Sequence, residues 1–205
     1  SATSSASTKL FHGGLRYLEY FEIRLVREAL IERETLLRAM PHISWPMRFV
    51  LPIYKDMRFE GSTPTSRILN IVMPWMKGRR PAWLIRLGLF LYDHLGGRKM
   101  LPPTKVLRRG KSDKLAPLRE EFRLAFEYSD CWVEDSRLVL LNILDAEKKG
   151  AKAFSYSRVT DVQRKKGHWL VSIKSKERSF RVKTKVLINT MGPWVNSLSQ
   201  LEKNK

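Results

Sequence analysis

The stretch A-T-S-S-A-S-T-K-L-F-H-G-G-L-R-Y-L-E, from Ala2 to Glu19, opens the chain and decides how the rest is interpreted. It places hydroxyl side chains, a lysine, a histidine, two glycines and an arginine ahead of a helical pattern. Hydroxyls and exposed backbone N–H groups can hydrogen-bond a pyrophosphate or a ribityl chain, and adjacent glycines let the backbone approach a flat ring. The segment therefore suits an anionic, planar cofactor, and it equally suits a plain tail before a helix.

The middle of the chain alternates periodic and irregular segments. Apolar residues at helical spacing predict an amphipathic helix over 18–40, which Pro41 ends, and residues 45–53 predict a strand. Pro81 at the first helical position and Gly96 after the last predict a second helix over 82–95. Residues 55–78 have no consistent period, and residues 101–114 are rich in proline and charge. We predict a loop or insertion for the first and a loop for the second.

The last third has a different pattern. Asp135 is a plausible cap for a helix over 136–149, and three extended runs follow at 153–162, 169–173 and 180–189. They predict a three-stranded meander, whose last run continues into a buried strand over 186–189 and a turn at Thr190-Met191-Gly192. The fold class is therefore α/β.

Composition limits the classes of partner. The 205 residues carry a net charge of +19, but the basic clusters are loose, so we interpret them as a solvated basic surface. Attachment to anionic lipid through the apolar helical face of Trp83, Leu87 and Phe90 stays open, as does nucleic-acid binding, the weaker alternative. The apolar stretches are shorter than the roughly 20 residues of a membrane span, and the first residues do not read as a secretory signal, so we expect a cytoplasmic protein.

The acidic group around the single cysteine does not predict a metal site. Cys131 lies between Asp130 and Glu134, and one thiol with carboxylates lacks the ligand spacing of zinc sites. We expect Cys131 to be a buried apolar residue and the chain to bind no metal.

Four separated blocks carry a family resemblance. The opening stretch is followed by RPAWLIRLGLFLYDHLGGR at 80–98, FEYSDCWVEDSRLVLLN at 126–142 and INTMGPWV at 188–195. In this order they resemble the FAD-dependent aerobic, respiratory glycerol-3-phosphate dehydrogenases. The resemblance implies a partial FAD-binding fold of the glutathione-reductase or D-amino-acid-oxidase type, with a three-stranded meander and an incomplete parallel sheet.

The resemblance also divides the chain. Residues 1–54 would be the flavin-facing segment and helix of the FAD domain, and 55–79 an insertion or loop. Residues 80–129 would form the substrate and membrane-proximal region, and 130–205 the helix, meander and strand-turn of the FAD domain.

The same resemblance implies site residues. Arg16 and Tyr17 would bind the substrate, since a guanidinium fork suits a phosphate. His12 would accept the proton of the substrate hydroxyl or, the interpretation we favour, hold the glycine turn. The positions implied for FAD are Thr3, Ser4, Ser5, Ser7, Lys9, Leu10, Gly13, Gly14, Val159, Thr190, Met191 and Gly192.

The activity implied is oxidation of sn-glycerol 3-phosphate to dihydroxyacetone phosphate, with electrons passed to quinone at the inner face of the plasma membrane. The family's G-x-G-x-x-G turn is missing from the sequence, and the family continues well past Trp194. We therefore expect an internal fragment that needs complementary fragments and alone neither holds FAD tightly nor oxidises the substrate. The alternatives are a non-catalytic remnant of a split or decaying gene and a basic module that binds nucleic acid or anionic lipid.

Overall fold

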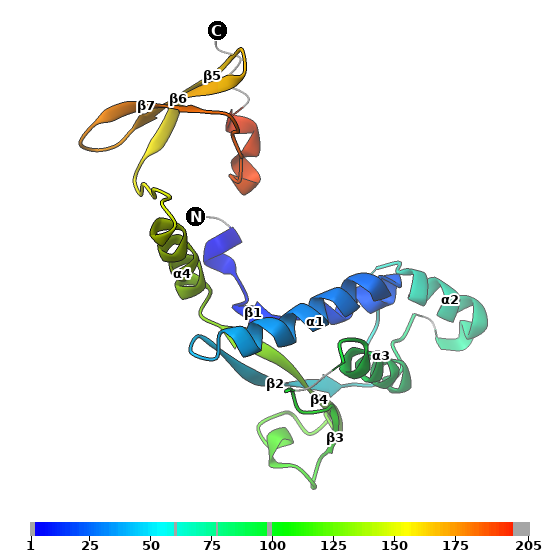
Figure 1. Cartoon of the computed structure of the whole chain (residues 1–205). Helices are drawn as coiled ribbons and strands as arrows, with labels where there is room; N and C mark the ends of the chain where they lie inside the picture. Colours follow the sequence, from blue (N-terminus) through cyan, green and yellow to red (C-terminus); the bar gives the residue numbers. More distant parts are fainter. Residues whose placement is uncertain (1–2, 60, 77, 98–99, 199–205) are drawn as a thin grey trace. The chain divides into compact units, whose positions relative to one another are not determined.

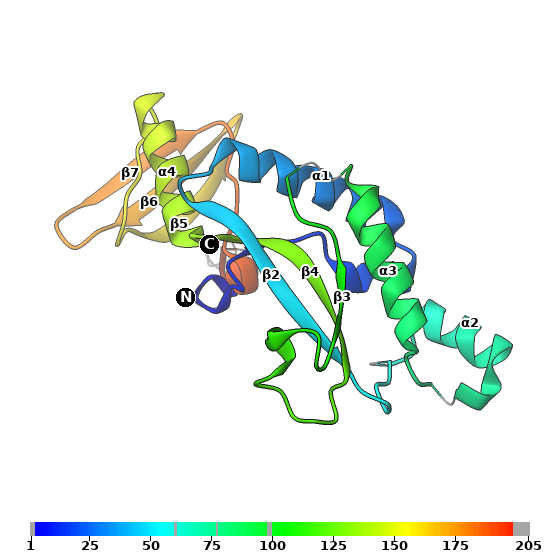
Figure 2. The ribbon, with the colours of Figure 1, turned by 90° about the horizontal axis from the view of Figure 1, so that it is seen from below.

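The computed structural model describes residues 3–59, 61–76, 78–97 and 100–198 (Figures 1 and 2). They form two compact units. The larger unit spans Ser7–Val139, and the smaller unit combines the described residues of Ser1–Ala6 and Leu140–Lys205. No described helix is both long and apolar enough to cross a membrane.

The larger unit is built on an antiparallel sheet with β4 (Leu124–Val133) at its centre. The strand predicted at 45–53 is confirmed as β2 (Ser44–Ile53), which pairs with β4 along its whole length. The short β1 (Leu10–Phe11) and β3 (Lys105–Arg108) also pair with β4. The register places Trp45 opposite Trp132, and their rings stack with centroids 4.3 Å apart.

Two helices bring the sequence-distant parts of this unit together. The helix predicted over 18–40 is two elements, the 3-10 helix η2 (Leu15–Tyr20) and α1 (Ile23–Ala39). They are separated at Phe21, whose φ of 60° ends η2 in the left-handed region. The second helix is confirmed as α3 (Ala82–Leu95). Figure 1 shows α1 lying along the sheet, and the core where α1 meets α3 is Val26, Leu30 and Tyr92.

The segments that we predicted as loops contain regular structure. Residues 55–79 hold α2 (Pro64–Val72) and η3 (Pro74–Met76). Thr63 and Ser66 form a reciprocal capping box at the start of α2, and Pro64 occupies the first turn, where proline is favourable. In the sequence alone, the same proline indicates a loop. The loop predicted at 101–114 contains β3 and the start of η4 (Asp113–Leu115), because Leu107 and Leu115 bury themselves against Ala125.

The smaller unit contains the predicted meander. Strands β5 (Arg158–Lys165), β6 (His168–Lys174) and β7 (Ser179–Thr184) form an antiparallel sheet in sequence order. The predicted helix is α4 (Asp135–Lys148), and Asp135 Oδ1 accepts a hydrogen bond from the Ser136 N–H at 2.8 Å. The boundary between the two units falls within α4. The 3-10 helices η1 (Thr3–Ala6) and η5 (Gly192–Trp194) also belong to this unit.

The predicted buried strand over 186–189 does not form in this chain. Val186 and Ile188 are 67% and 77% exposed, and the segment takes part in no described ladder. A strand needs a neighbour for its backbone N–H and C=O groups, and every named strand pair among the described residues is antiparallel. The parallel part of the expected sheet is therefore not represented in the part of the chain that the structure describes.

Candidate functional site

The site begins at residues 12–14, which we call the glycine turn and which connect β1 to η2. Gly13 is buried, and its N–H donates to the Tyr92 hydroxyl at 2.7 Å. A Cβ at Gly13 would lie 2.3 Å from Leu30 Cδ2, so only glycine fits. Gly14 has a φ of 67° and lies under the Tyr17 ring, where a Cβ would meet a carbon at 2.7 Å. Both glycines of the motif are therefore required by the local structure.

A buried network of polar side chains supports the glycine turn through the Gly13 N–H. The Tyr92 hydroxyl donates to Asp130 Oδ1 at 2.8 Å, and Arg33 Nη1 donates to the same oxygen at 2.6 Å. Arg33 also donates to the Ser129 carbonyl oxygen at 3.1 Å. Burial raises the pKa of the Asp130 carboxyl, while the hydrogen bond from Tyr92 and the charge of Arg33 oppose that rise. Burial likewise raises the pKa of the Tyr92 hydroxyl, so it stays protonated and able to donate.

Sequence reasoning missed this network, although one signal was present. Arg33 lies on the same helical face as the buried Val26, Leu30 and Leu37. A charged residue on an apolar face indicates a buried partner, because an unpaired buried charge is too costly. The sequence pattern around Asp130 indicates only a strand-to-helix connection.

His12 takes part in the turn itself. Its Nδ1 accepts a hydrogen bond from the Gly14 N–H at 3.1 Å. A neutral imidazole that accepts at Nδ1 carries its proton on Nε2, so in this arrangement Nε2 is a donor and has no lone pair for a proton. This contact favours the turn-holding role of His12 over the role of proton acceptor.

The segment before the turn presents cationic and polar groups. Lys9 has a φ of 55°, and its Nζ lies 3.4 Å from Asp135 Oδ1. The Lys9 N–H donates to Ser7 Oγ at 3.0 Å, and its carbonyl accepts from the Val133 N–H at 2.9 Å. Leu10 follows in β1, opposite Trp132. Ser5 and Ser7 are exposed, whereas the side chains of Thr3 and Ser4 lie outside the described part of the structure.

The two predicted substrate residues lie on η2, directly after the glycine turn. Tyr17 is 50% exposed. Arg16 borders a cavity of about 500 Å³ between η2 and α3. Its polar lining is Arg16, Glu19, Thr65 and Arg80, and its apolar lining is Leu15, Leu18, Phe21, Ile23, Leu51, Leu84, Ile85, Leu87, Leu91 and Tyr128, with Gly88.

Part of that cavity wall comes from α2. Thr65 Oγ1 donates to the Glu19 carbonyl oxygen at 2.7 Å, and the Glu19 carboxylate pairs with Arg80 at 2.7 Å. The wall is mostly apolar, which does not match the body of a small polyol. We therefore do not place the body of the polyol in this cavity, and Arg16, which borders it, is its one lining residue with a predicted substrate role.

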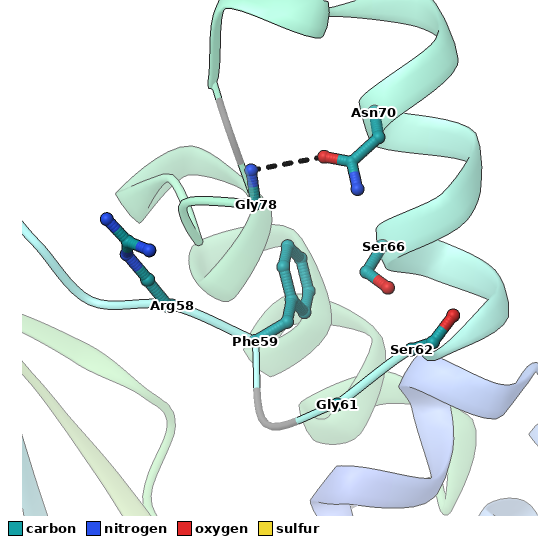
Figure 3. A pocket seen from close by; sticks show the side chains of 7 residues that line it. All are labelled: Arg58, Phe59, Gly61, Ser62, Ser66, Asn70 and Gly78. Atoms are coloured by element: carbon teal, nitrogen blue, oxygen red, sulfur yellow. Dashed lines mark hydrogen bonds between the residues drawn. The ribbon is translucent and has the colours of Figure 1, made fainter.

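A second, smaller cavity of about 280 Å³ lies beside α2 (Figure 3). Its lining residues are Arg58, Phe59, Gly61, Ser62, Ser66, Asn70 and Gly78. The Gly78 N–H donates to Asn70 Oδ1 at 3.1 Å, and Ser66 is occupied by the capping box of α2. No residue predicted for cofactor or substrate borders this cavity.

The remaining predicted positions lie in the smaller unit. At the 190–192 turn, Asn189 Oδ1 accepts from the Met191 N–H at 3.1 Å, and Gly192 has a φ of 55°. Thr190, Met191 and Gly192 are all exposed. Val159 lies in β5 opposite Ile173, at a bulge. The larger unit thus brings together Ser7, Lys9, Leu10, Gly13, Gly14, Arg16 and Tyr17, and the smaller unit holds Thr3, Ser4, Ser5, Val159 and the 190–192 turn.

No group of three or more His, Cys, Asp or Glu side chains that could hold a metal ion is found among residues 3–59, 61–76, 78–97 and 100–198. Cys131 is buried, as predicted, and burial raises the pKa of its thiol to about 11. It is therefore poorly suited to act as a nucleophile.

A family model described as FAD dependent oxidoreductase matches residues 1–205, and the chain belongs to this family. FAD is the cofactor of the family.

Curated relatives narrow the comparison. The chain is 48% identical over 200 residues to D-erythritol 1-phosphate dehydrogenase of Brucella abortus (strain 2308), covering 96% of this chain and 35% of the relative. It is 46% identical over 196 residues to glycerol-3-phosphate dehydrogenase of Pseudomonas tolaasii (95% and 33%). It is 45% identical over 196 residues to aerobic glycerol-3-phosphate dehydrogenase of Escherichia coli (strain K12) (95% and 34%). The chain spans about a third of the length of these relatives.

Solved structures support the fold. The glycerol-3-phosphate dehydrogenase from Bacillus halodurans complexed with FAD matches with a TM-score of 0.55 at 19% identity, covering 96% of this chain and 28% of that one. L-proline dehydrogenase from P. horikoshii matches with a TM-score of 0.53 at 15% identity, covering 88% and 42%. The FAD-binding oxidoreductase fold predicted from the sequence is confirmed.

The donor groups at the described positions fit FAD chemically. The hydroxyls of Ser5 and Ser7 and the ammonium of Lys9 are of the kind that donate to ribityl and phosphate oxygens, and Ser7 and Lys9 bond the Asp135 carboxylate in this structure. Gly192 has a positive φ, and no atom lies within 4 Å of the place that a Cβ would take, so its backbone is open to close approach.

Proposed function

We propose that the protein containing this chain is an FAD-dependent dehydrogenase that oxidises a secondary alcohol of a polyol monophosphate. The family supplies the cofactor class. Relatives at 45–48% identity are named for glycerol 3-phosphate and D-erythritol 1-phosphate, both of which are phosphorylated polyols. The leading substrate is sn-glycerol 3-phosphate, with dihydroxyacetone phosphate as product.

One observation carries this proposal. The glycine turn, fixed by the buried Tyr92 hydroxyl, leads within two residues to Arg16 on η2. The segment that we assign to the flavin and the cation that we assign to the substrate phosphate therefore belong to one short, well-held piece of backbone. Such a piece can fix the distance between a cofactor and a substrate, which is what orientation requires.

The residues would have separate tasks. When bound, FAD supplies the two-electron acceptor that no side chain can provide. Arg16 would bind the substrate phosphate through parallel hydrogen bonds, and Tyr17 would lie beside it. His12 would hold the turn through Nδ1 and offer its Nε2–H as a donor. Ser5, Ser7, Lys9, the glycines and the 190–192 turn would line the dinucleotide.

The choice of polyol phosphate is tested directly. The protein, reconstituted with FAD, is assayed with a soluble dye as electron acceptor on sn-glycerol 3-phosphate, D-erythritol 1-phosphate and unphosphorylated glycerol. We expect kcat/KM to be highest for glycerol 3-phosphate and to collapse for glycerol, because the phosphate is the group that Arg16 binds. A higher value for D-erythritol 1-phosphate would reassign the substrate within the class, and no activity on either phosphate would reject the function.

Arg16→Lys is the matched test of the phosphate role. It keeps the charge and removes the bidentate fork, so KM for the phosphate substrate should rise by about tenfold or more while flavin binding is retained. Arg27→Lys, on the exposed surface of α1, is the control and should leave KM unchanged.

The proposed electron acceptor is quinone, reached from the surface of a membrane. The support is α3, where Trp83, Leu87 and Phe90 are 51%, 47% and 56% exposed and Arg86 is exposed beside them. An apolar face flanked by arginine suits an anionic lipid surface. Sedimentation with anionic vesicles, lost in the double variant Trp83→Ser and Phe90→Ser and absent with neutral vesicles, would support peripheral attachment at the inner face of the plasma membrane.

Binding experiments on the same protein distinguish the two alternative functions, a non-catalytic remnant and a nucleic-acid module. A non-catalytic remnant would bind no FAD even when supplied with complementary fragments of the enzyme. A nucleic-acid module would bind duplex DNA or RNA with a steep dependence on salt concentration.

A further inference from the structure

The Tyr92 hydroxyl has two partners, and together they fix the direction of each hydrogen bond. The Gly13 N–H can only donate, so the hydroxyl oxygen accepts there, at 2.7 Å. The hydroxyl proton must then point to Asp130 Oδ1, at 2.8 Å. The chain of bonds therefore runs in one direction, from the Gly13 backbone to the Asp130 carboxylate.

The carboxylate end of this chain is anchored to two further elements. Arg33 on α1 donates to Asp130 at 2.6 Å and to the Ser129 carbonyl in β4 at 3.1 Å. The side chains of Arg33 and Asp130 are 4% and 7% exposed, so solvent does not compete for these bonds. The guanidinium also lies 5.3 Å from the centre of the Tyr92 ring. Helices α1 and α3 and strand β4 thus meet at one carboxylate oxygen, Asp130 Oδ1.

The glycine turn is also held sterically. The space at Gly13 where a Cβ would go is filled by Leu30 and by the edge of the Tyr92 ring, at 2.3 and 2.9 Å. The Gly13 backbone packs directly on these side chains. The hydrogen bond from its N–H to the Tyr92 hydroxyl therefore determines where the turn lies. Without the hydroxyl, the Gly13 N–H would be buried with no acceptor, a state that costs enough for the turn to move toward water.

We propose that Tyr92 is a positioning residue, whose hydroxyl, held by Asp130 and Arg33, fixes the glycine turn and with it the place of Arg16. The effect of Tyr92 on catalysis rests on the proposed function, whereas its effect on the position of the glycine turn does not.

The test compares Tyr92→Phe with Tyr54→Phe in the protein that contains this chain. Tyr92→Phe keeps the ring and removes only the hydroxyl. Tyr54→Phe makes the same chemical change at an exposed tyrosine that contacts Phe122, away from the network. Three quantities are measured: amide hydrogen exchange of residues 10–17, the midpoint of thermal unfolding, and kcat and KM with flavin bound.

We expect Tyr92→Phe to speed exchange at Gly13 by about tenfold. We expect it to lower kcat/KM by about tenfold, mainly through a rise in KM like that expected of Arg16→Lys, beyond any loss of folded protein. Tyr54→Phe should leave both within about twofold of the wild type. Equal exchange and equal kcat/KM in the two variants would overturn the proposal, as would a fall in kcat/KM that only follows the fraction of folded protein.

Two further results distinguish a failure of the proposed function from a failure of the role proposed for Tyr92. If the wild type binds FAD but oxidises neither polyol phosphate, the proposed function fails, while exchange at Gly13 still decides the role of Tyr92. If Tyr92→Phe does not fold, Arg33→Lys replaces it, since lysine keeps a charge near Asp130 but cannot reproduce both bonds of the guanidinium. Faster Gly13 exchange in that variant supports the proposal, and unchanged exchange contradicts it.

Discussion

Two glycine-bearing turns were predicted to line the same cofactor, and they are built in opposite ways. The glycine turn of the larger unit is buried and held by Tyr92, Asp130 and Arg33. The 190–192 turn of the smaller unit is exposed and held by its own neighbour, since Asn189 bonds the Met191 N–H and the Val195 carbonyl. The first turn therefore derives its geometry from tertiary structure, and the second derives its geometry from local sequence.

The largest loss of stability is expected when the network that supports the glycine turn is broken. Asp130→Ala leaves the Arg33 guanidinium buried without its partner and should lower the free energy of unfolding by about 3–5 kcal/mol. Urea unfolding followed by circular dichroism measures it. Asp145→Ala, which removes the exposed pair with Lys149, is the control and should cost less than about 0.5 kcal/mol. Equal losses in the two variants would show that the network contributes no special support.

The second prediction concerns overpacking at the first turn. In Gly13→Ala the new Cβ would lie 2.3 Å from Leu30 Cδ2 and 2.9 Å from Tyr92, so side chains must move. We expect a loss of about 2–3 kcal/mol in the same unfolding measurement. Gly13→Ala combined with Leu30→Ala should recover part of that loss relative to Leu30→Ala alone. Additive losses would contradict a steric cause.

Gly192→Ala is the matched change at the second turn. No atom lies within 4 Å of the added Cβ, and the only cost is the φ of 55°. We expect about 1 kcal/mol, and Gly192→Asn should cost less because asparagine tolerates the left-handed region. A loss as large as that of Gly13→Ala would mean that the second turn is packed in solution.

The stability of the larger unit should depend on pH through the buried carboxylate of Glu127. Glu127 is 3% exposed, and hydrogen bonds from Arg48 hold its pKa below the ordinary value of 4.5, with Lys114 acting in the same direction. Because the folded pKa is the lower one, this carboxylate contributes stability above pH 4.5 that is lost as the pH falls through its folded pKa. The free energy of unfolding is measured at pH 7 and in acid for the wild type and for Glu127→Gln. The loss of stability between the two conditions should be smaller in Glu127→Gln by about 1 kcal/mol. An identical acid loss in this variant would exclude Glu127 as its source.

The parts of the fold that could be predicted are those where neighbouring residues decide the outcome. The residues that start and end helices, at α3 and α4, and the extended runs of β2 and the meander were sufficient. The start of α2 was missed because Pro64 both interrupts a pattern and suits a first helical turn. The 186–189 strand was wrong because its formation depends on a partner strand and not on its own apolar residues.

The site shows the same division. Gly13 and Gly14 are predicted to let the backbone approach a cofactor, whereas in the structure they make room for the side chains of Leu30, Tyr92 and Tyr17. The family resemblance supplied Arg16 and Tyr17, and their substrate roles stay predictions. The Tyr92–Asp130–Arg33 network joins residues 38 and 97 positions apart along the chain, which no spacing rule relates. Only the fold brings them together. Whether Val159 and the 190–192 turn meet the dinucleotide stays a prediction.

The most direct measurement is an experimental structure of the protein containing this chain with FAD bound. We predict that one FAD molecule has atoms within about 4.5 Å of both the glycine turn and the 190–192 turn, while the Gly13 N–H stays bonded to the Tyr92 hydroxyl. An FAD molecule that touches neither turn, or only one of them, would contradict this prediction.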